Sequence, residues 1–328
     1  MANAREIQAR IKSIRDTMKI TSAMYMISSA KLKKARKNLE NTEPYFDMLQ
    51  GTITRIVRHL PEMEHRYFEE GKLPKGKMAE ESHGIEEKQM GDELWPWNKI
   101  PEKTSSKKRG YLVIAADKGL AGAYNHNVIK LTERCLQNGT QDLLFVVGEL
   151  GREYFIQHDI SVYKEFRYAV QDPNLTRARD IADCMVSLYD EGKLDEIYVI
   201  YTYAVNSMKV EAQVQRLLPL KKEVFATAIP SDVYAEDIRM VPSAEKVLDY
   251  VVPDYVTGFI YGALVESFCS EQNARMMAME AATDNAEKML KELQITFNRV
   301  RQGAITQEIT EVIAGAKAQK KRRRSSRT

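Results

Sequence analysis

The sequence is poor in cysteine and has no long apolar run. Its three cysteines, Cys135, Cys184 and Cys269, lie far apart without CxxC spacing, which excludes a disulfide framework and a thiolate zinc site. No uninterrupted apolar stretch approaches the roughly 18 to 20 residues that a membrane-spanning helix needs. The first residues also lack the apolar core of a secretion signal. We therefore expect a protein of a reducing compartment that does not span a membrane.

Proline is missing from both ends of the chain. All ten prolines lie between residues 44 and 253, and proline breaks or kinks the interior of a helix. Asn3, followed three residues later by Glu6, fits a helix N-cap. Within an N-terminal helical segment, residues 1–60, we expect one helix from Asn3 to Pro44. A second helix is expected over residues 254–316.

Both helical segments carry a seam of apolar, small or polar residues at alternating spacings of four and three, which is typical of a coiled coil. The first seam is Ile7, Ile11, Ile14, Met18, Thr21, Tyr25, Ser28, Leu32, Ala35 and Leu39. The second is Phe268, Gln272, Arg275, Met279, Ala282, Ala286, Met289, Leu293, Thr296 and Val300. Residues 1–40 hold ten basic and three acidic side chains, and residues 255–316 hold eight acidic and five basic ones. We expect the two helices to pair; the alternative is that each packs separately on the middle of the chain.

The second helix is the longer by roughly 20 residues, or about 30 Å. Its excess carries an apolar face: Ile305, Ile309, Val312 and Ile313. These side chains are exposed unless a sleeve surrounds them, or else they pack against the first helix.

Strand and helix patterns alternate over residues 109–250. Buried strands are predicted at 111–116, 142–147 and 196–204, with helices at 127–136 and 176–189. A further extended segment at 211–220 contains Pro219, so it is expected at an edge. The alternation predicts a Rossmann-like α/β domain with a mostly parallel sheet.

Residues 62–108 form a charged insertion. Twenty of these 47 residues are charged, and both tryptophans, Trp95 and Trp97, lie there. The composition indicates a loop or a partly disordered segment. The tryptophans either dock on a partner or cover the α/β domain.

Motifs for catalysis are weak. The loop 117–125, DKGLAGAYN, follows a strand and precedes a helix, where phosphate-binding loops lie, but it lacks GKS/T and GxGxxG. The five histidines show no paired metal-ligand spacing. We predict no catalytic, cofactor or metal site; the alternative is a nucleotide-binding α/β enzyme with a helical dimerisation arm.

The tail, residues 317–328, holds seven Lys or Arg residues and no acid. The net charge of the whole chain is +3, so the remainder is acidic. Mutual repulsion predicts a frayed, solvated end beyond about residue 318. Nucleic-acid binding by a basic-tailed adaptor is the weaker alternative, because no aromatic residues are interleaved for base stacking.

The two ends together resemble the gamma subunit of the F-type ATP synthase. The resemblance rests on IQARIKSIRDTMKITSAMYMISSAKLKKAR, on SEQNARMMAMEAATDNAEKML and FNRVRQGAITQEITEVIAGA, and on ADKGLAGAYN. It covers residues 3–60 and 109–316. The chain differs from the family in the 62–108 insertion, in the basic tail and in Ala121, where many members have cysteine.

The resemblance implies a fold and a function. The terminal helices would form a long antiparallel coiled coil, the shaft of a rotor that transmits torque from a membrane c ring to a ring of alpha and beta subunits. The protein would itself be non-catalytic, and it would lie at the cytoplasmic face of a bacterial plasma membrane without spanning it.

The resemblance also implies contact residues. Beta-subunit contacts are expected at Met24, Arg301, Gln302, Thr306 and Glu308. The bearing within the alpha/beta ring would be Ile305, Ile309, Val312 and Ile313. Contacts to the epsilon subunit or the c ring are expected at Tyr201, Tyr203, Asn206 and Ser207.

Overall fold

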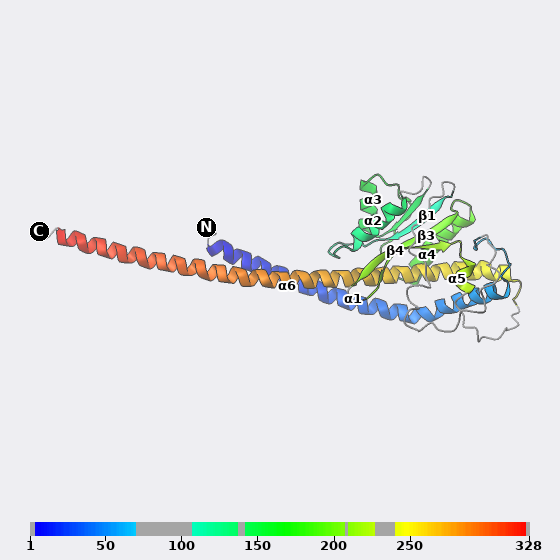
Figure 1. Cartoon of the computed structure of the whole chain (residues 1–328), viewed down its shortest axis with the longest axis horizontal. Coiled ribbons are helices and arrows are strands. Elements are labelled where there is room, and N and C mark those ends of the chain that lie inside the picture. Colours follow the sequence, from blue (N-terminus) through cyan, green and yellow to red (C-terminus); the bar gives the residue numbers. More distant parts are fainter. Residues whose placement is uncertain (1–3, 70–106, 137–141, 207–208, 227–239, 326–328) are drawn as a thin grey trace, which may run out of the picture. The chain divides into compact units, whose positions relative to one another are not determined.

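The computed structural model describes residues 4–69, 107–136, 142–206, 209–226 and 240–325, with side chains up to residue 317. Asn3, Trp95 and Trp97 lie outside these residues, as does most of the insertion. The chain forms two compact units (Figure 1). One consists of residues 1–27 and 276–328, and the other of residues 28–275. The helices α1 (Ala4–His59) and α6 (Ala244–Ser325) each contribute to both.

Helix α1 passes through Pro44, where the sequence predicted its end. An interior proline costs about 3 kcal/mol. Beyond it, Ile53, Ile56 and Val57 are almost completely buried in the core of the larger unit. Burying each of these side chains contributes about 1.5 to 3 kcal/mol, which outweighs the cost and extends the helix to His59.

Helix α6 also exceeds its predicted bounds at both ends. It begins ten residues earlier, at Ala244, where the Ser243 hydroxyl accepts a hydrogen bond from the Lys246 amide. It continues to Ser325, past residue 318, beyond which the sequence predicted a frayed end. Lys and Arg have good helix propensity and are favourable near a helix C-terminus.

The sheet of the larger unit has the strand order β2-β1-β3-β4. Strands β1 (Arg109–Ile114), β2 (Leu143–Val147) and β3 (Glu196–Ala204) are parallel. Strand β4 (Val210–Leu218) pairs antiparallel with β3 at the edge. The predicted fold class is therefore confirmed.

Helices cover both faces of this sheet. Side chains of β1 and β2 on one face, such as Tyr111 and Val146, pack with α2 (Tyr124–Leu136) and α3 (Glu149–Gln157). On the other face lie α4 (Leu175–Asp190), the second half of α1 and the first part of α6. Helix α3 was not predicted, nor was the short α5 (Lys222–Ala226).

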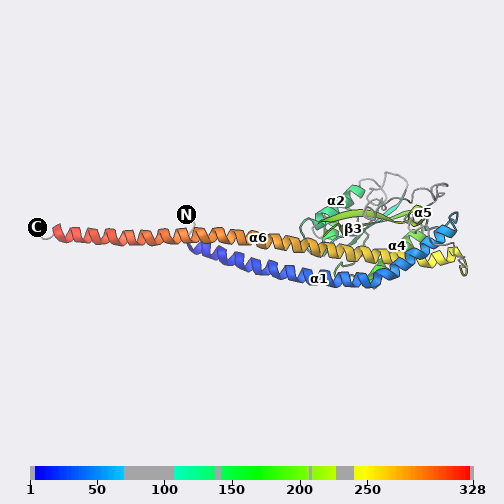
Figure 2. The same ribbon diagram turned by 60° about the horizontal axis from the view of Figure 1, so that its bottom comes forward.

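In the smaller unit, α1 and α6 lie side by side and antiparallel (Figures 1 and 2). Ile7, Ile11, Met279 and Ala286 are buried there. The hydroxyl oxygens of Thr21 and Thr283 are 2.7 Å apart in a hydrogen bond between the helices. The predicted pairing is present.

The α6 seam departs from the predicted positions near its end. Met289 and Thr296 are exposed, whereas Leu290 and Phe297 are half-buried in their place. A straight α-helix has 3.6 residues per turn and drifts relative to a strict seven-residue repeat. Leu293 and Val300 are half-buried as predicted, so the drift replaces only Met289 and Thr296 by the residues that follow them.

Candidate functional site

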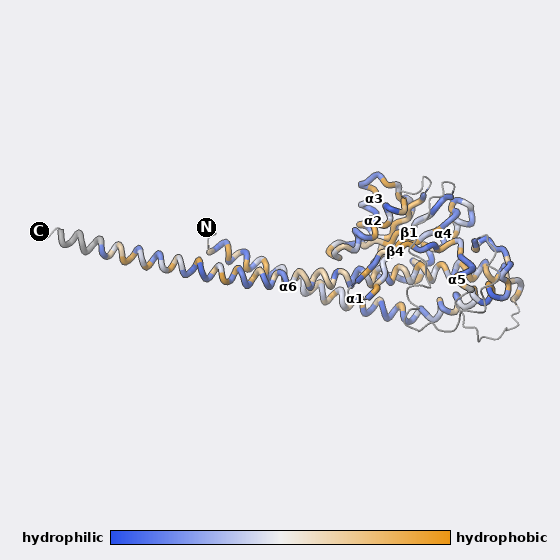
Figure 3. The backbone as a smooth tube through the Cα atoms, viewed as in Figure 1, coloured by the Kyte–Doolittle hydropathy of each residue, from blue (hydrophilic) through white to orange (hydrophobic). Residues whose placement is uncertain are grey.

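The last part of α6 is an unpaired helix. From Arg301 to Lys317 every described side chain is exposed. The predicted apolar face is 48% exposed at Ile305, 55% at Ile309, 72% at Val312 and 50% at Ile313. Figure 3 shows apolar positions recurring among polar ones along this segment. These side chains therefore do not pack against α1, which was the alternative.

Polar residues share this helix surface. Arg301, Gln302, Thr306 and Glu308 are all exposed, and the Thr306 hydroxyl donates to the Gln302 carbonyl at 2.9 Å. Gln302, Thr306, Ile309 and Ile313 follow spacings of four, three and four, so they form one stripe. The stripe offers a partner both hydrogen-bonding and apolar groups.

Met24 lies elsewhere in the same unit. It is half-buried on α1, next to a cavity of about 430 Å³ lined by Tyr25, Met26, Glu280 and Thr283, among others. From residue 280 to Arg301 the helix rises about 30 Å, at 1.5 Å per residue. The structure thus places the predicted beta-subunit contacts at two separate levels of the coiled coil.

The residues predicted to contact the epsilon subunit or the c ring lie where β3 turns into β4. The Tyr201 hydroxyl donates to Gln215 at 3.2 Å, and that of Tyr203 to Glu211 at 3.5 Å. The Asn206 side chain accepts the Lys209 amide at 2.7 Å. Both tyrosines are half-buried and Asn206 is exposed, while Ser207 lies outside the described residues.

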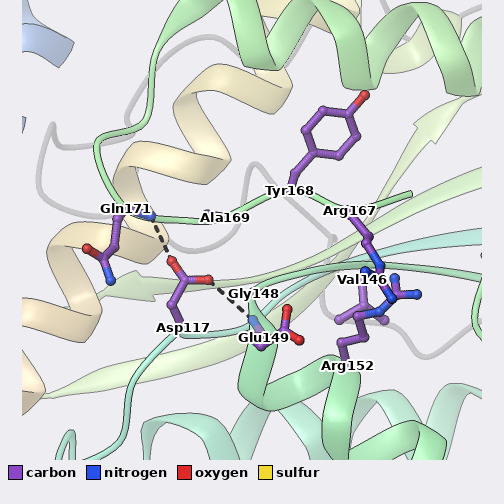
Figure 4. A pocket seen from close by; sticks show the side chains of 9 residues that line it. All are labelled: Asp117, Val146, Gly148, Glu149, Arg152, Arg167, Tyr168, Ala169 and Gln171. Carbon is purple, nitrogen blue, oxygen red and sulfur yellow. Dashed lines mark hydrogen bonds between the residues drawn. The ribbon is translucent and has the colours of Figure 1, made fainter. Parts of the chain in front are cut away.

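The loop after β1 is occupied by the protein's own groups. One carboxylate oxygen of Asp117 accepts the amides of Val170 and Gln171, at 2.9 and 3.0 Å, and the other accepts the Glu149 amide at 3.2 Å (Figure 4). Glu149 begins α3, so this carboxylate occupies the place where a helix N-terminus would hold a phosphate. A cavity of about 450 Å³ remains beside it, lined also by Arg152 and Arg167.

An arginine of α6 also binds the same loop. The buried Arg275 donates to the carbonyl of Lys118 at 3.2 Å and to that of Gly119 at 3.0 Å. The sequence placed Arg275 in the seam and missed this role. A charged residue at a seam position was the available signal, because such positions normally face another helix. The Asp117 carboxylate and the carbonyls of Lys118 and Gly119 are thus bound by groups of the chain itself.

Two features are absent from the described residues. They contain no group of three or more His, Cys, Asp or Glu side chains that could hold a metal ion. Among them, no helix is both long and apolar enough to pass through a bilayer.

Comparison with known proteins identifies the family. The model of the ATP synthase family matches residues 3–319. The ATP synthase gamma chain of Acetivibrio thermocellus is 41% identical, with 98% of this chain and 100% of that protein aligned. The gamma chain of Ruminiclostridium cellulolyticum is 40% identical over 96% of this chain and 98% of its own length.

Solved structures agree on the fold. The alignment with a chain of the Euglena gracilis mitochondrial ATP synthase covers 96% of this chain and 94% of that one, with a TM-score of 0.59 and 14% identity. A chain from the central stalk and c-ring of the Tetrahymena thermophila mitochondrial enzyme gives a TM-score of 0.51 and 22% identity, over 80% of this chain and 99% of that one. With its paired terminal helices and this match over nearly its whole length, the chain belongs to the ATP synthase gamma chain family and is a non-catalytic rotor subunit of an F-type ATP synthase.

Proposed function

We propose that this subunit transmits torque by turning the bare end of α6 inside the ring of alpha and beta subunits. The observation that carries the proposal is the exposed apolar stripe from Ile305 to Ile313. A helix with an exposed apolar face gains free energy when a partner removes that face from water. A smooth apolar sleeve would do so at every angle of rotation, which suits a bearing.

The beta subunits would contact two levels of the coiled coil. Met24 forms the level near the paired helices, and Arg301, Gln302, Thr306 and Glu308 form the level on the bare helix. Arg301 can pair with an acidic side chain in one rotary state and release it in the next, because an exposed ion pair contributes only about 0 to 1 kcal/mol.

The turn between β3 and β4, in the larger unit, would couple to the membrane part. The turn after β3, with Tyr203, Asn206 and Ser207, and the nearby Tyr201 would contact the epsilon subunit or the c ring. Asn206 offers an exposed polar side chain for such a contact. The closely related gamma chains named above come from bacteria, so we place the subunit at the cytoplasmic face of the plasma membrane.

The torque proposal is tested by reconstituting the alpha and beta subunits with this chain. The purified chain alone is expected to hydrolyse no ATP, and the reconstituted ring is expected to do so with rotation of the chain. Replacing Ile305, Ile309 and Ile313 together by Ser should weaken ring binding, whereas Leu at the same positions should preserve it. Equal binding by the Ser and Leu variants would refute the bearing.

The Met24 level has its own test. Met24→Lys adds a charge to a half-buried contact, so we expect ATP synthesis per translocated ion to fall about fivefold, the factor that corresponds to about 1 kcal/mol. Met24→Leu is the matched control, because it keeps the volume and the apolar surface. Synthesis per ion measured in membrane vesicles decides, and an unchanged yield for Met24→Lys would remove Met24 from the contact.

A further inference from the structure

We propose that a polar stripe of α6, Glu266, Ser267, Glu271 and Arg275, fixes the axial register of this helix against the sheet. These would be positioning residues, because they make the α/β domain and the adjoining part of α6 turn as one body. The proposal rests on the torque function proposed above. All of these residues lie within the larger unit.

The stripe lies at the carboxyl ends of β1 and β3. Strand β1 lies between β2 and β3, so the strand that follows β1 in sequence lies on one side of it and the next strand lies on the other side. Such a reversal of strand order is a switch point, where α/β proteins bind their ligands. Here α6 occupies that crevice. The Thr202 amide donates to the Ser267 hydroxyl at 3.1 Å, and the Ala204 amide donates to a Glu266 carboxylate oxygen at 3.0 Å.

The second half of the stripe, Glu271 and Arg275, binds the loop after β1. Glu271 and Arg275 form an ion pair of 2.5 Å, and both side chains are at least nine-tenths buried. Arg275 also donates hydrogen bonds to the carbonyls of Lys118 and Gly119, so its charge is stabilised both by Glu271 and by the loop. Burial raises the pKa of Glu271, against the opposing effect of Arg275.

The apolar part of α6 cannot set the register by itself. Leu248, Val252, Val256, Ile260 and Leu264 are all completely buried and recur every four residues. A shift of this ladder by about one turn places an aliphatic side chain on nearly every site that loses one, so apolar burial distinguishes such registers poorly. Hydrogen bonds are directional and leave buried groups unsatisfied when they are displaced.

The polar stripe lacks that tolerance. After a slide of α6 by four residues that puts Ala263 where Ser267 accepted the Thr202 amide, Glu271 stands where Arg275 donated to the loop carbonyls. A buried amide would then lack an acceptor and a carboxylate would face carbonyl oxygens, which is strongly unfavourable. A single buried polar contact is a recognised means of fixing helix register.

Neighbouring serines provide a matched pair for the test. Ser267 and Ser270 are both completely buried on α6. The Ser267 hydroxyl accepts the Thr202 amide, whereas that of Ser270 has no hydrogen-bond partner among the described residues. The two serine-to-alanine changes remove the same atom, and they differ in the hydrogen bond that Ser267 accepts from Thr202. Glu266→Ala is combined with Ser267→Ala, so that the double variant lacks both α6 side chains that accept hydrogen bonds from β3 amides.

Amide exchange of the full chain is the first readout. In Ser267→Ala/Glu266→Ala we expect the Thr202 and Ala204 amides to exchange about tenfold faster. The amides of β1 facing β2 should be unchanged, and Ser270→Ala should match the wild type. Unchanged exchange at Thr202 and Ala204 would overturn the register contact, whatever the fate of the torque proposal.

Coupling in the assembled complex is the second readout. Ions pumped per ATP hydrolysed should fall about fivefold in the double variant and stay constant in Ser270→Ala. Faster exchange with normal coupling would overturn the role in torque and leave the bearing proposal intact. If the double variant fails to assemble, Glu271→Gln takes its place, because it keeps the volume but removes the charge from the ion pair. Amide exchange is then followed at Gly119 and Leu120, and coupling is measured as before.

Discussion

At the scale of single residues, an ion pair joins Arg216 of the edge strand β4 to Glu69 in the segment after α1. Arg216 holds Glu69 with contacts of 2.6 and 3.1 Å, and these hydrogen bonds lower the pKa of Glu69 despite partial burial. A lowered carboxyl pKa contributes stability above the ordinary value of 4.5 that is lost as the pH falls through the lowered value.

Arg216→Gln should remove this contribution. We expect a loss of about 1 kcal/mol at pH 7, a figure reduced from the usual charged hydrogen bond because Glu69 is partly exposed. The loss should shrink as the pH falls below 4.5 and disappear below the lowered pKa, where Glu69 is protonated in both proteins. Chemical unfolding between pH 7 and pH 3 measures it, and an equal loss at every pH would show that Arg216 acts through packing.

Two glycines with positive φ show how backbone and space act separately. Gly148 has φ +98°, and a Cβ there would lie 2.2 Å from the Ala115 carbonyl oxygen. Gly122 has φ +56° and open space around it. Gly122→Ala should cost about 1 to 2 kcal/mol for the left-handed backbone alone. Gly148→Ala should cost more than 3 kcal/mol, and equal unfolding free energies for the two variants would contradict this account.

At the scale of the elements, the paired helices are joined by small and polar groups at Thr21 and Thr283. Each hydroxyl also lies within hydrogen-bond distance of a carbonyl of its own helix, Met18 for Thr21 and Met279 for Thr283, so either threonine can be the donor between the helices. Replacing one threonine by valine removes this bond and leaves the other hydroxyl only its own carbonyl, at a cost of about 1 kcal/mol. Replacing both should be nearly neutral. A double-mutant cycle on thermal unfolding tests this, and strictly additive losses would refute the direct pairing.

The elements also show how far the sequence could be read. The parallel strands were predictable because their apolar runs are continuous, and β3 was predicted with its observed bounds. Pro44 misled the prediction because burial of Ile53 and Ile56 is a tertiary effect. Helix α3 was missed because its start depends on Asp117, 32 residues earlier in the chain. The exposed apolar face from Ile305 to Ile313 was predictable. The hydrogen bonds of Arg275 to the loop after β1 were not, because they depend on where that distant loop lies in the fold.

At the scale of the whole chain, the basic tail is the most uneven feature of the charge distribution. Its seven positive charges follow an apolar stripe that stops near Ala316. We therefore expect deletion of residues 317–328 to change ATP hydrolysis by the complex by less than about twofold, because exposed ion pairs contribute little. A regulatory brake would instead give a large increase on deletion at low salt that shrinks at high salt. Hydrolysis rates of both proteins at several ionic strengths separate the two.

The unpaired segment from Arg301 onward has a thermodynamic consequence for assembly. No described residue packs against this segment, so its helical order rests on propagation from the paired part of α6 alone. Its helical order in the free subunit should therefore fluctuate, and entry into a sleeve would couple helix ordering to burial. Assembly should then show a larger negative heat-capacity change and a larger entropic cost than the docking of two rigid surfaces.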